Sequence, residues 1–266
     1  MNPIELYKKL PKKNCGKCPQ KACMPFALSV IKGDAELSEC PCLTEKEIEA
    51  LKGAIKKSDW REELIAKLRD EIKGIDFADI AEDIGADLKD GALIIKCMGR
   101  EFVISPEGEI TTRGHMTPWI KILLLHYIRT AGKGSLSGKL VSYAELKAGM
   151  VKASSFQRDC EEPLRELFDK NFEGTITVLN RLGAERREDF PAKQAWHIFL
   201  LPKIPVIILY WPKEEEFESK VKIIFDSTAD RFLDAESIIF LVEGLVKNIE
   251  ITLSRVAGAN FSVTPK

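Results

Sequence analysis

Residues 14–23 read Asn-Cys-Gly-Lys-Cys-Pro-Gln-Lys-Ala-Cys, and Cys40-Pro41 follows after sixteen intervening residues. This stretch places four cysteines in the pattern C-x2-C-x4-C-x16-C. Four thiolates complete the coordination of a cubane iron–sulfur cluster, with one thiolate on each iron. Gly16 can take backbone angles closed to other residues, which lets the loop turn tightly. The spacing therefore predicts an iron–sulfur cluster and, with it, an electron carrier.

Zinc and disulfides are the alternative uses of such cysteines. A structural zinc site usually pairs two C-x2-C hooks or adds histidines, whereas this chain has one hook and no histidine before His115. Disulfides suit a secreted chain, but Met1–Pro11 carries Lys8 and Lys9 and no apolar run of the signal-peptide kind. A zinc site stays open as the lesser alternative, and a disulfide framework is less favoured still.

The cysteine stretches also resemble a known module. Asn14–Cys18, Cys23–Ala27 and Cys40–Leu43 are similar to the [4Fe-4S] module that begins the large subunit of the corrinoid iron–sulfur proteins, over roughly residues 3 to 45. The resemblance implies that the cluster ligands are Cys15, Cys18, Cys23 and Cys40. Cys42 stands where that family usually has another residue. It is a substitute ligand, a redox-active thiol or a bystander, and we favour the bystander.

Composition bounds the remaining functions. With 266 residues, 45% of them hydrophobic, the chain has room for one large domain or two smaller ones. A net charge of −1 argues against a general nucleic-acid binder. The longest apolar run, Trp119–Ile128, is interrupted by Lys121 and His126 and is too short to span a bilayer. Seven cysteines and an oxygen-sensitive cofactor indicate the reducing cytoplasm.

Charge is uneven along the chain. Residues 1–23 hold six lysines and one acidic residue, a local balance of 6 − 1 = +5. Nearby lysines favour the more negative, reduced state of a thiolate-bound cluster and can steer an acidic redox partner. Solvated surface lysines are the plainer interpretation.

Periodicity and capping signals predict an α+β chain: a small helical iron–sulfur module at residues 1–58, followed by an α+β domain with a small antiparallel sheet at residues 59–266. Helices are expected at 24–32, from the Thr44/Glu47 capping box to about 57, from 58 onward, at 78–84, from Thr117-Pro118, and at 161–170, 172–182 and 235–256. Strands are expected as a hairpin of 92–97 with 101–104, and at 205–211 and 221–225.

Other chemistry-bearing residues give weaker signals. Residues 132–139, Gly-Lys-Gly-Ser-Leu-Ser-Gly-Lys, fail the P-loop pattern, so a flexible loop is favoured over a phosphate site. The isolated histidines His115, His126 and His197 are expected to be structural, with His126 and Tyr127 as a hydrogen-bonded core pair. Cys97 is expected in the core, and the acidic setting of Cys160 disfavours its thiolate. The acidic residues between Asp226 and Glu236 fit a helix start better than a metal site.

Residues 75–255 carry a second resemblance. Leu125-His126-Tyr127, Leu140–Leu146, Phe199–Pro202 and Phe225-Asp226-Ser227 are similar to a domain of unknown function, numbered 3786, found in anaerobic bacteria and archaea behind such cluster modules. The resemblance implies no activity and no catalytic residues. The corrinoid protein itself is excluded, because its (β/α)8 barrel needs about 200 residues of regular alternation.

Two functions remain from different classes. The first is a one-electron carrier with a [4Fe-4S] cluster that serves a redox partner, either a corrinoid or another low-potential metalloprotein such as a ferredoxin, in anaerobic metabolism. The second is a non-enzymatic interaction or assembly protein whose cluster is structural or senses redox state. Whether the chain is an enzyme stays open, because no nucleophile and base are paired in the sequence.

Overall fold

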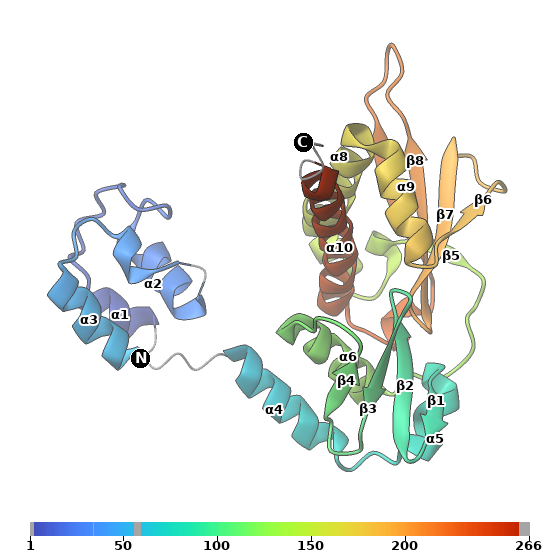
Figure 1. The fold of residues 1–266 in the computed structure, drawn as a ribbon, viewed down its shortest axis with the longest axis horizontal. Helices are drawn as coiled ribbons and strands as arrows, with labels where there is room; N and C mark the ends of the chain where they lie inside the picture. The colour runs from blue at the N-terminus through green and yellow to red at the C-terminus, as the bar shows by residue number, and fades with distance from the viewer. Residues whose placement is uncertain (1–2, 34, 56–59, 261–266) are drawn as a thin grey trace, which may run out of the picture. The chain divides into compact units, whose positions relative to one another are not determined.

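The computed structural model describes residues 3–33, 35–55 and 60–260 (Figure 1). The chain divides into two compact units, Met1–Leu64 and Ile65–Lys266. Helix α4 (Trp60–Ile72) runs across this division. The boundary expected near residue 58 lies outside the described residues, so the domains 1–58 and 59–266 stay a prediction.

The first unit is helical. Its elements are α1 (Pro3–Lys9), α2 (Cys23–Lys32), the 3-10 turn η1 (Leu37–Glu39) and α3 (Glu45–Ala54). Helix α2 ends at Gly33, whose φ of 83° is left-handed and favours glycine. The predicted capping box at the start of α3 is confirmed: Thr44 Oγ1 accepts from the Glu47 N–H, and the Thr44 N–H donates to Glu47. A small core holds the helices together and includes Leu6, Phe26, Ala27, Leu37 and Leu51.

The second unit begins with a four-stranded antiparallel sheet. Its strands are β1 (Asp87–Lys89), β2 (Ala92–Cys97), β3 (Arg100–Ile104) and β4 (Ile110–Thr112), in the order β1-β2-β3-β4. The predicted β2–β3 hairpin is confirmed, with Leu93 paired to Ile104 and Ile95 paired to Phe102. All four of these side chains are buried, because alternate residues of a strand share one face. Helix α5 (Phe77–Ile84) precedes the sheet and ends at Gly85.

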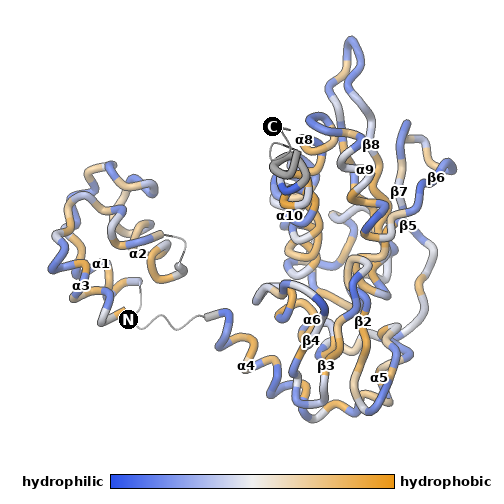
Figure 2. The backbone as a smooth tube through the Cα atoms, viewed as in Figure 1, coloured by the Kyte–Doolittle hydropathy of each residue, from blue (hydrophilic) through white to orange (hydrophobic). Residues whose placement is uncertain are grey.

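A five-stranded antiparallel sheet forms the larger part of this unit. Its order is β5-β9-β8-β7-β6, made of β5 (Leu140–Ser142), β6 (Glu185–Arg187), β7 (Gln194–Leu201), β8 (Ile204–Trp211) and β9 (Lys220–Asp226). The central strand β8 is buried from Ile204 to Tyr210. In Figure 2 it is hydrophobic, whereas the loop that joins it to β9 is hydrophilic.

Helices cover one face of the larger sheet. Figure 1 shows α8 (Glu162–Lys170), α9 (Phe172–Arg181) and α10 (Ala235–Asn260) against that face. The unit also contains α6 (Pro118–Thr130) and α7 (Gly149–Phe156). A π turn (Gln157–Glu161) joins α7 to α8, and the 3-10 turns η2 (Tyr143–Glu145) and η4 (Ala229–Arg231) complete the unit. No helix among the described residues is both long and apolar enough to cross a membrane.

Hydrogen bonds tie the larger sheet to the elements around the smaller one. The Tyr127 hydroxyl donates to the Ile84 carbonyl at 2.7 Å and accepts from the Lys203 N–H at 3.1 Å. The Met98 N–H donates to the Leu200 carbonyl, which links the β2–β3 turn to β7. Because Tyr127 is fully buried, its hydroxyl bonds to these backbone groups instead of to water.

The glycine-rich loop at residues 132–139 holds an internal carboxylate. Asp226, which is 3% exposed, accepts from the N–H groups of Ser137 and Gly138, at 3.1 and 2.7 Å, and from both the N–H and the hydroxyl of Thr228. Burial by itself raises the pKa of Asp226, but the hydrogen bonds from Thr228 and Ser137 outweigh it and lower the pKa to about 2. The loop thus binds an anion of the chain itself.

The α+β class is confirmed, with one difference in the sheets. The strands form two antiparallel sheets instead of the one expected. Strands β1, β4, β5 and β6 are three residues long, so alternation between two faces leaves almost no pattern in the sequence. The expected helices at 78–84, 161–170, 172–182 and 235–256 match α5, α8, α9 and α10 to within a few residues at each end.

Tyr127→Phe removes the hydroxyl that joins the end of α5 to the β7–β8 turn. We expect a loss of about 1–3 kcal/mol in the free energy of unfolding, because the Ile84 carbonyl and the Lys203 N–H lose a buried partner. Tyr143→Phe is the matched control, since the Tyr143 hydroxyl donates to the Ala235 carbonyl alone. Urea unfolding of both variants measures the difference. An equal or larger loss in Tyr143→Phe would contradict the role given to Tyr127.

Asp226→Asn tests the internal anion through its pH dependence. A carboxyl whose pKa is lowered on folding stabilises the protein above its unfolded pKa of about 3.9, and this contribution disappears as the pH falls towards 2. We expect Asp226→Asn to lose about 2 kcal/mol at pH 7 and to show a flatter stability curve between pH 4 and 2. Asp87→Asn, at an exposed position on β1, is the control. The midpoints of unfolding at several pH values test this prediction. If the stability of the wild type and of Asp226→Asn fell in parallel as the pH is lowered, the lowered pKa given to Asp226 would be refuted.

Candidate metal centre

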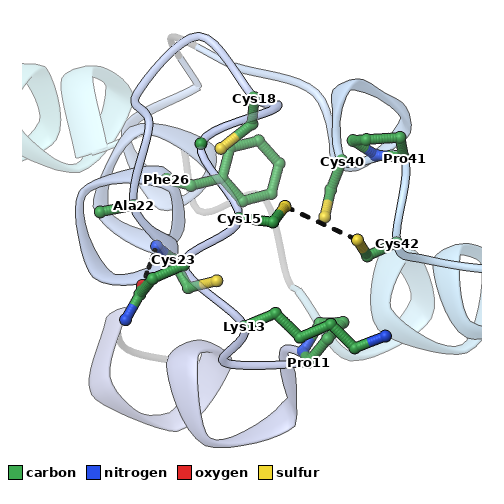
Figure 3. A pocket seen from close by; sticks show the side chains of 12 residues that line it. Pro11, Lys13, Cys15, Cys18, Ala22, Cys23, Phe26, Cys40, Pro41 and Cys42 are labelled. Carbon is green, nitrogen blue, oxygen red and sulfur yellow. Dashed lines mark hydrogen bonds between the residues drawn. The ribbon is translucent and has the colours of Figure 1, made fainter.

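Five cysteines of the first unit line one pocket (Figure 3). They are Cys15, Cys18, Cys23, Cys40 and Cys42. Cys15 and Cys18 lie in the loop between α1 and α2, Cys23 is the first residue of α2, and Cys40 directly follows η1. The structure therefore brings all four sequence-predicted residues to one place, and it adds Cys42.

Left-handed backbone angles shape the loop that carries the first three thiols. Lys12, Asn14, Gly16 and Lys21 have φ values of 56°, 44°, 71° and 55°. Glycine adopts this conformation without strain, and asparagine tolerates it better than most residues. The Asn14 side chain accepts from the Cys23 N–H at 2.8 Å, which fixes the start of α2 against the loop. The turns thus direct Cys15, Cys18 and Cys23 toward a common space.

A second turn returns Cys42 to the same pocket. The Leu43 N–H donates to the Cys40 carbonyl at 3.1 Å, closing a four-residue turn with Pro41 in its second position and Cys42 in its third. Proline suits the second position of such a turn because its φ is already fixed near the required value. The hydrogen bond and the proline together place two thiols, Cys40 and Cys42, beside one pocket.

The thiols differ in exposure. Cys18, Cys23 and Cys40 are 9%, 7% and 6% exposed, whereas Cys42 is half-buried and Cys15 is exposed. Phe26 in α2 also lines the pocket and is itself buried. The Cys15 side of the pocket is therefore the side that faces solvent.

Cys15 and Cys42 contact each other, with their sulfur atoms 3.7 Å apart. The backbone amide of Lys17, followed by the Cys42 thiol, lowers the pKa of Cys15 by hydrogen bonding to its thiolate. The same thiol–thiol hydrogen bond, with Cys15 as the thiolate, raises the pKa of Cys42. Of the two thiols, Cys15 therefore converts more readily to the thiolate.

The donor set fits an iron–sulfur cluster. Neither a histidine nor a carboxylate lines this pocket, and thiolates select zinc, copper(I) or iron–sulfur clusters over magnesium or calcium. Within residues 3–33, 35–55 and 60–260, no three His, Cys, Asp or Glu side chains are grouped tightly enough to hold a single ion. The thiols line the pocket from several segments, and a cubane cluster takes one protein thiolate on each iron.

The remaining sequence candidates have structural partners. His126 Nδ1 hydrogen bonds to Ser237, while Tyr127 bonds elsewhere, so the expected pairing of His126 with Tyr127 is wrong. Cys97 is buried in β2, as expected, and burial raises its pKa to about 12. Burial, more than the acidic neighbours invoked from the sequence, raises the pKa of Cys160. The acidic residues after β9 cap turns: Asp230 accepts from the Lys147 N–H, and Asp234 from the Ser237 N–H.

A groove in the second unit had no signal in the sequence. Asp169 in α8 accepts from the Tyr210 hydroxyl at 2.8 Å and from Arg165, while the rings of Phe168 and Tyr210 stack 4.7 Å apart. Phe168, Asp169 and Tyr210 line a groove together with Phe172. They come from α8, α9 and β8, so no local spacing in the sequence could have grouped them.

Two family models match the chain, in agreement with both resemblances. Residues 10–42 match the family described as "Putative Fe-S cluster", and residues 76–248 match the family described as "Domain of unknown function (DUF3786)". No solved structure matches the chain.

Curated relatives match a short part of the chain. The corrinoid/iron-sulfur protein large subunit of Moorella thermoacetica is 45% identical over 51 residues, which are 19% of this chain and 11% of that protein. The acetyl-CoA decarbonylase/synthase complex subunit gamma of Methanothermobacter thermautotrophicus is 38% identical over 52 residues, 20% of this chain and 11% of that subunit. A gamma 2 subunit of the same complex, from Methanosarcina thermophila, is 34% identical over 86 residues, 32% of this chain and 17% of that subunit.

The chain thus shares its N-terminal stretch with these relatives and spans only 11% to 17% of their length. The shared stretch and the cluster family together support an iron–sulfur protein. Because the second family model covers more than half of the chain, this protein belongs to the DUF3786 family and carries an iron–sulfur cluster module ahead of that domain.

Proposed function

We propose that this protein holds one [4Fe-4S] cluster on Cys15, Cys18, Cys23 and Cys40 and passes single electrons to a corrinoid or another low-potential metalloprotein. The observation that carries the proposal is the cysteine-lined pocket, in a segment similar to corrinoid/iron-sulfur proteins. The seven free cysteines of the whole protein suit the reducing cytoplasm. When bound, the cluster supplies one-electron chemistry.

The chain's own residues suit electron exchange at a surface. Phe26 and the buried thiols Cys18, Cys23 and Cys40 close the inner side of the pocket. Cys15 leaves the outer side accessible, so a redox partner can approach a cluster bound there closely. Partial exposure and backbone hydrogen bonds to sulfur are two of the factors that set the reduction potential of such a centre.

Lysines give this surface its charge. Lys12, Lys13, Lys17 and Lys21 are exposed in the loop that carries the thiols, and Lys13 lines the pocket. A positive rim attracts an acidic partner and holds it near the exposed side of the pocket. The relatives named above include a corrinoid/iron-sulfur protein and subunits of an acetyl-CoA decarbonylase/synthase complex, which supports a protein partner of that kind.

Cys23→Ala tests the cluster. We expect the anaerobically purified wild type to contain iron and sulfide and to develop a paramagnetic cluster signal in EPR after dithionite reduction. Cys23→Ala should lose this signal because a buried ligand is gone. Cys97→Ala, which removes a buried thiol from β2 in the second unit, is the matched control and should retain it. Zinc in place of iron in the wild type would overturn the cofactor.

Electron transfer needs its own measurement. The reduced wild type should reduce a cobalt(II) corrinoid protein or an oxidised ferredoxin in stopped-flow mixing. A cluster that forms but fails to cycle reversibly would instead favour the assembly or redox-sensing role.

Lys13→Glu tests the charged rim. Reversing a charge beside the pocket should lower the midpoint potential, because a negative neighbour opposes the added electron, and should slow transfer to an acidic partner. The slowing should shrink as salt is added, since screening weakens both attraction and repulsion. Lys52→Glu is the control, because Lys52 lines a different hollow of the same unit. Equal potentials and rates in the two variants would argue against a functional rim.

A further inference from the structure

Cys42 lies inside the cysteine pocket and contacts one of the proposed cluster ligands. It lines the same pocket as the four proposed ligands, and its sulfur lies 3.7 Å from that of Cys15 (Figure 3). The turn closed by the Cys40–Leu43 hydrogen bond, with Pro41 inside it, directs Cys42 back toward Cys15 across 27 residues of sequence. The contact is therefore built by defined backbone geometry.

The distance between the two sulfurs has a specific meaning for a metal. Around a tetrahedral ion with metal–sulfur bonds of about 2.3 Å, neighbouring sulfurs lie about 3.8 Å apart. Cys15 and Cys42 match this separation, so both thiols can reach the same metal position. Each iron of a cubane cluster takes one protein thiolate, which leaves one of the two thiols spare at that corner.

We propose that Cys15 and Cys42 are alternative ligands for one iron of the cluster. This inference rests on the proposed function, because it requires the pocket to hold a cluster. In the exchange, the iron–sulfur bond to Cys15 breaks and an iron–sulfur bond to Cys42 forms. The proton of the Cys42 thiol passes to the Cys15 sulfur, and no electron is transferred.

Exposure explains why the exchange takes place at this corner. Cys18, Cys23 and Cys40 are buried and have little room to leave the pocket, whereas Cys15 is exposed and Cys42 half-buried. Each exchangeable thiol also has an exposed neighbour in the sequence: Gly16 follows Cys15, and Pro41 precedes Cys42. The outer corner of the cluster therefore has two ligands available and the inner corners have one each.

Four variants test the exchange: Cys15→Ala, Cys42→Ala, the double variant and Cys18→Ala. Each is reconstituted anaerobically with ferrous iron and sulfide, and iron, acid-labile sulfide and the EPR signal of the reduced protein are measured. We expect each single variant at Cys15 or Cys42 to keep most of the wild-type iron, and the double variant to lose it as Cys18→Ala does. Circular dichroism reports whether each variant is folded.

The outcomes separate this inference from the proposed function. A wild type that binds no iron would overturn both. A wild type that binds iron, with a folded Cys15→Ala that loses it to the same extent as Cys18→Ala, would overturn the exchange alone.

Alkylation of the wild-type protein provides a test that needs no variant. Iodoacetamide applied to the cluster-loaded protein should modify Cys15 in some molecules and Cys42 in others, with the remaining ligands protected. Peptide mass spectrometry locates the label. Modification confined to Cys42, with Cys15 fully protected, would show that Cys42 is a spare thiol and would overturn the exchange.

Discussion

Thiols carried by separate segments have to converge on one pocket, and the structure of the first unit depends on this constraint. The unit contains short helices around a small apolar core, and domains of this size bury too little surface to be very stable. Metal–thiolate bonds can supply folding free energy that such a core lacks. The left-handed residues of the loop and the turn at Pro41 are then the means by which a short chain directs several sulfurs inward.

The second unit depends on different interactions. Several of its buried polar groups form hydrogen bonds within the chain: Tyr127 bonds to two backbone groups, Asp226 fixes a loop, and the buried Glu161 accepts from both Lys222 and the Ile223 N–H. Buried hydrogen bonds of this kind fix one packing arrangement, because leaving any of the groups without a partner is costly. The unit thus has its own basis for stability apart from the cysteine pocket.

Structural features that are specified by three or four neighbouring residues could be predicted from the sequence. The Thr44/Glu47 capping box, the glycines that end α2 and α5, and Pro118 at the start of α6 all specify their helices locally. The cysteine spacing likewise predicted the pocket, because cysteine thiolates are the residues that hold an iron–sulfur cluster. The three-residue edge strands were not predicted, because their neighbours in the sheet stabilise them more than their own residue pattern does. The contact between Cys42 and Cys15 was not predicted either, because it depends on the direction in which the turn at Pro41 closes.

The carboxylate of Asp226 has a consequence for what the second unit can bind. A glycine-rich loop with free N–H groups is a general receptor for phosphate. Here the Ser137 and Gly138 N–H groups already donate to a side chain of the same chain. A tethered group competes at an effective concentration in the millimolar range or above, and folding holds this one in place. The Ser137 and Gly138 N–H groups are therefore already occupied when a dissolved phosphate approaches, and their bonds to Asp226 fix the loop to the end of strand β9.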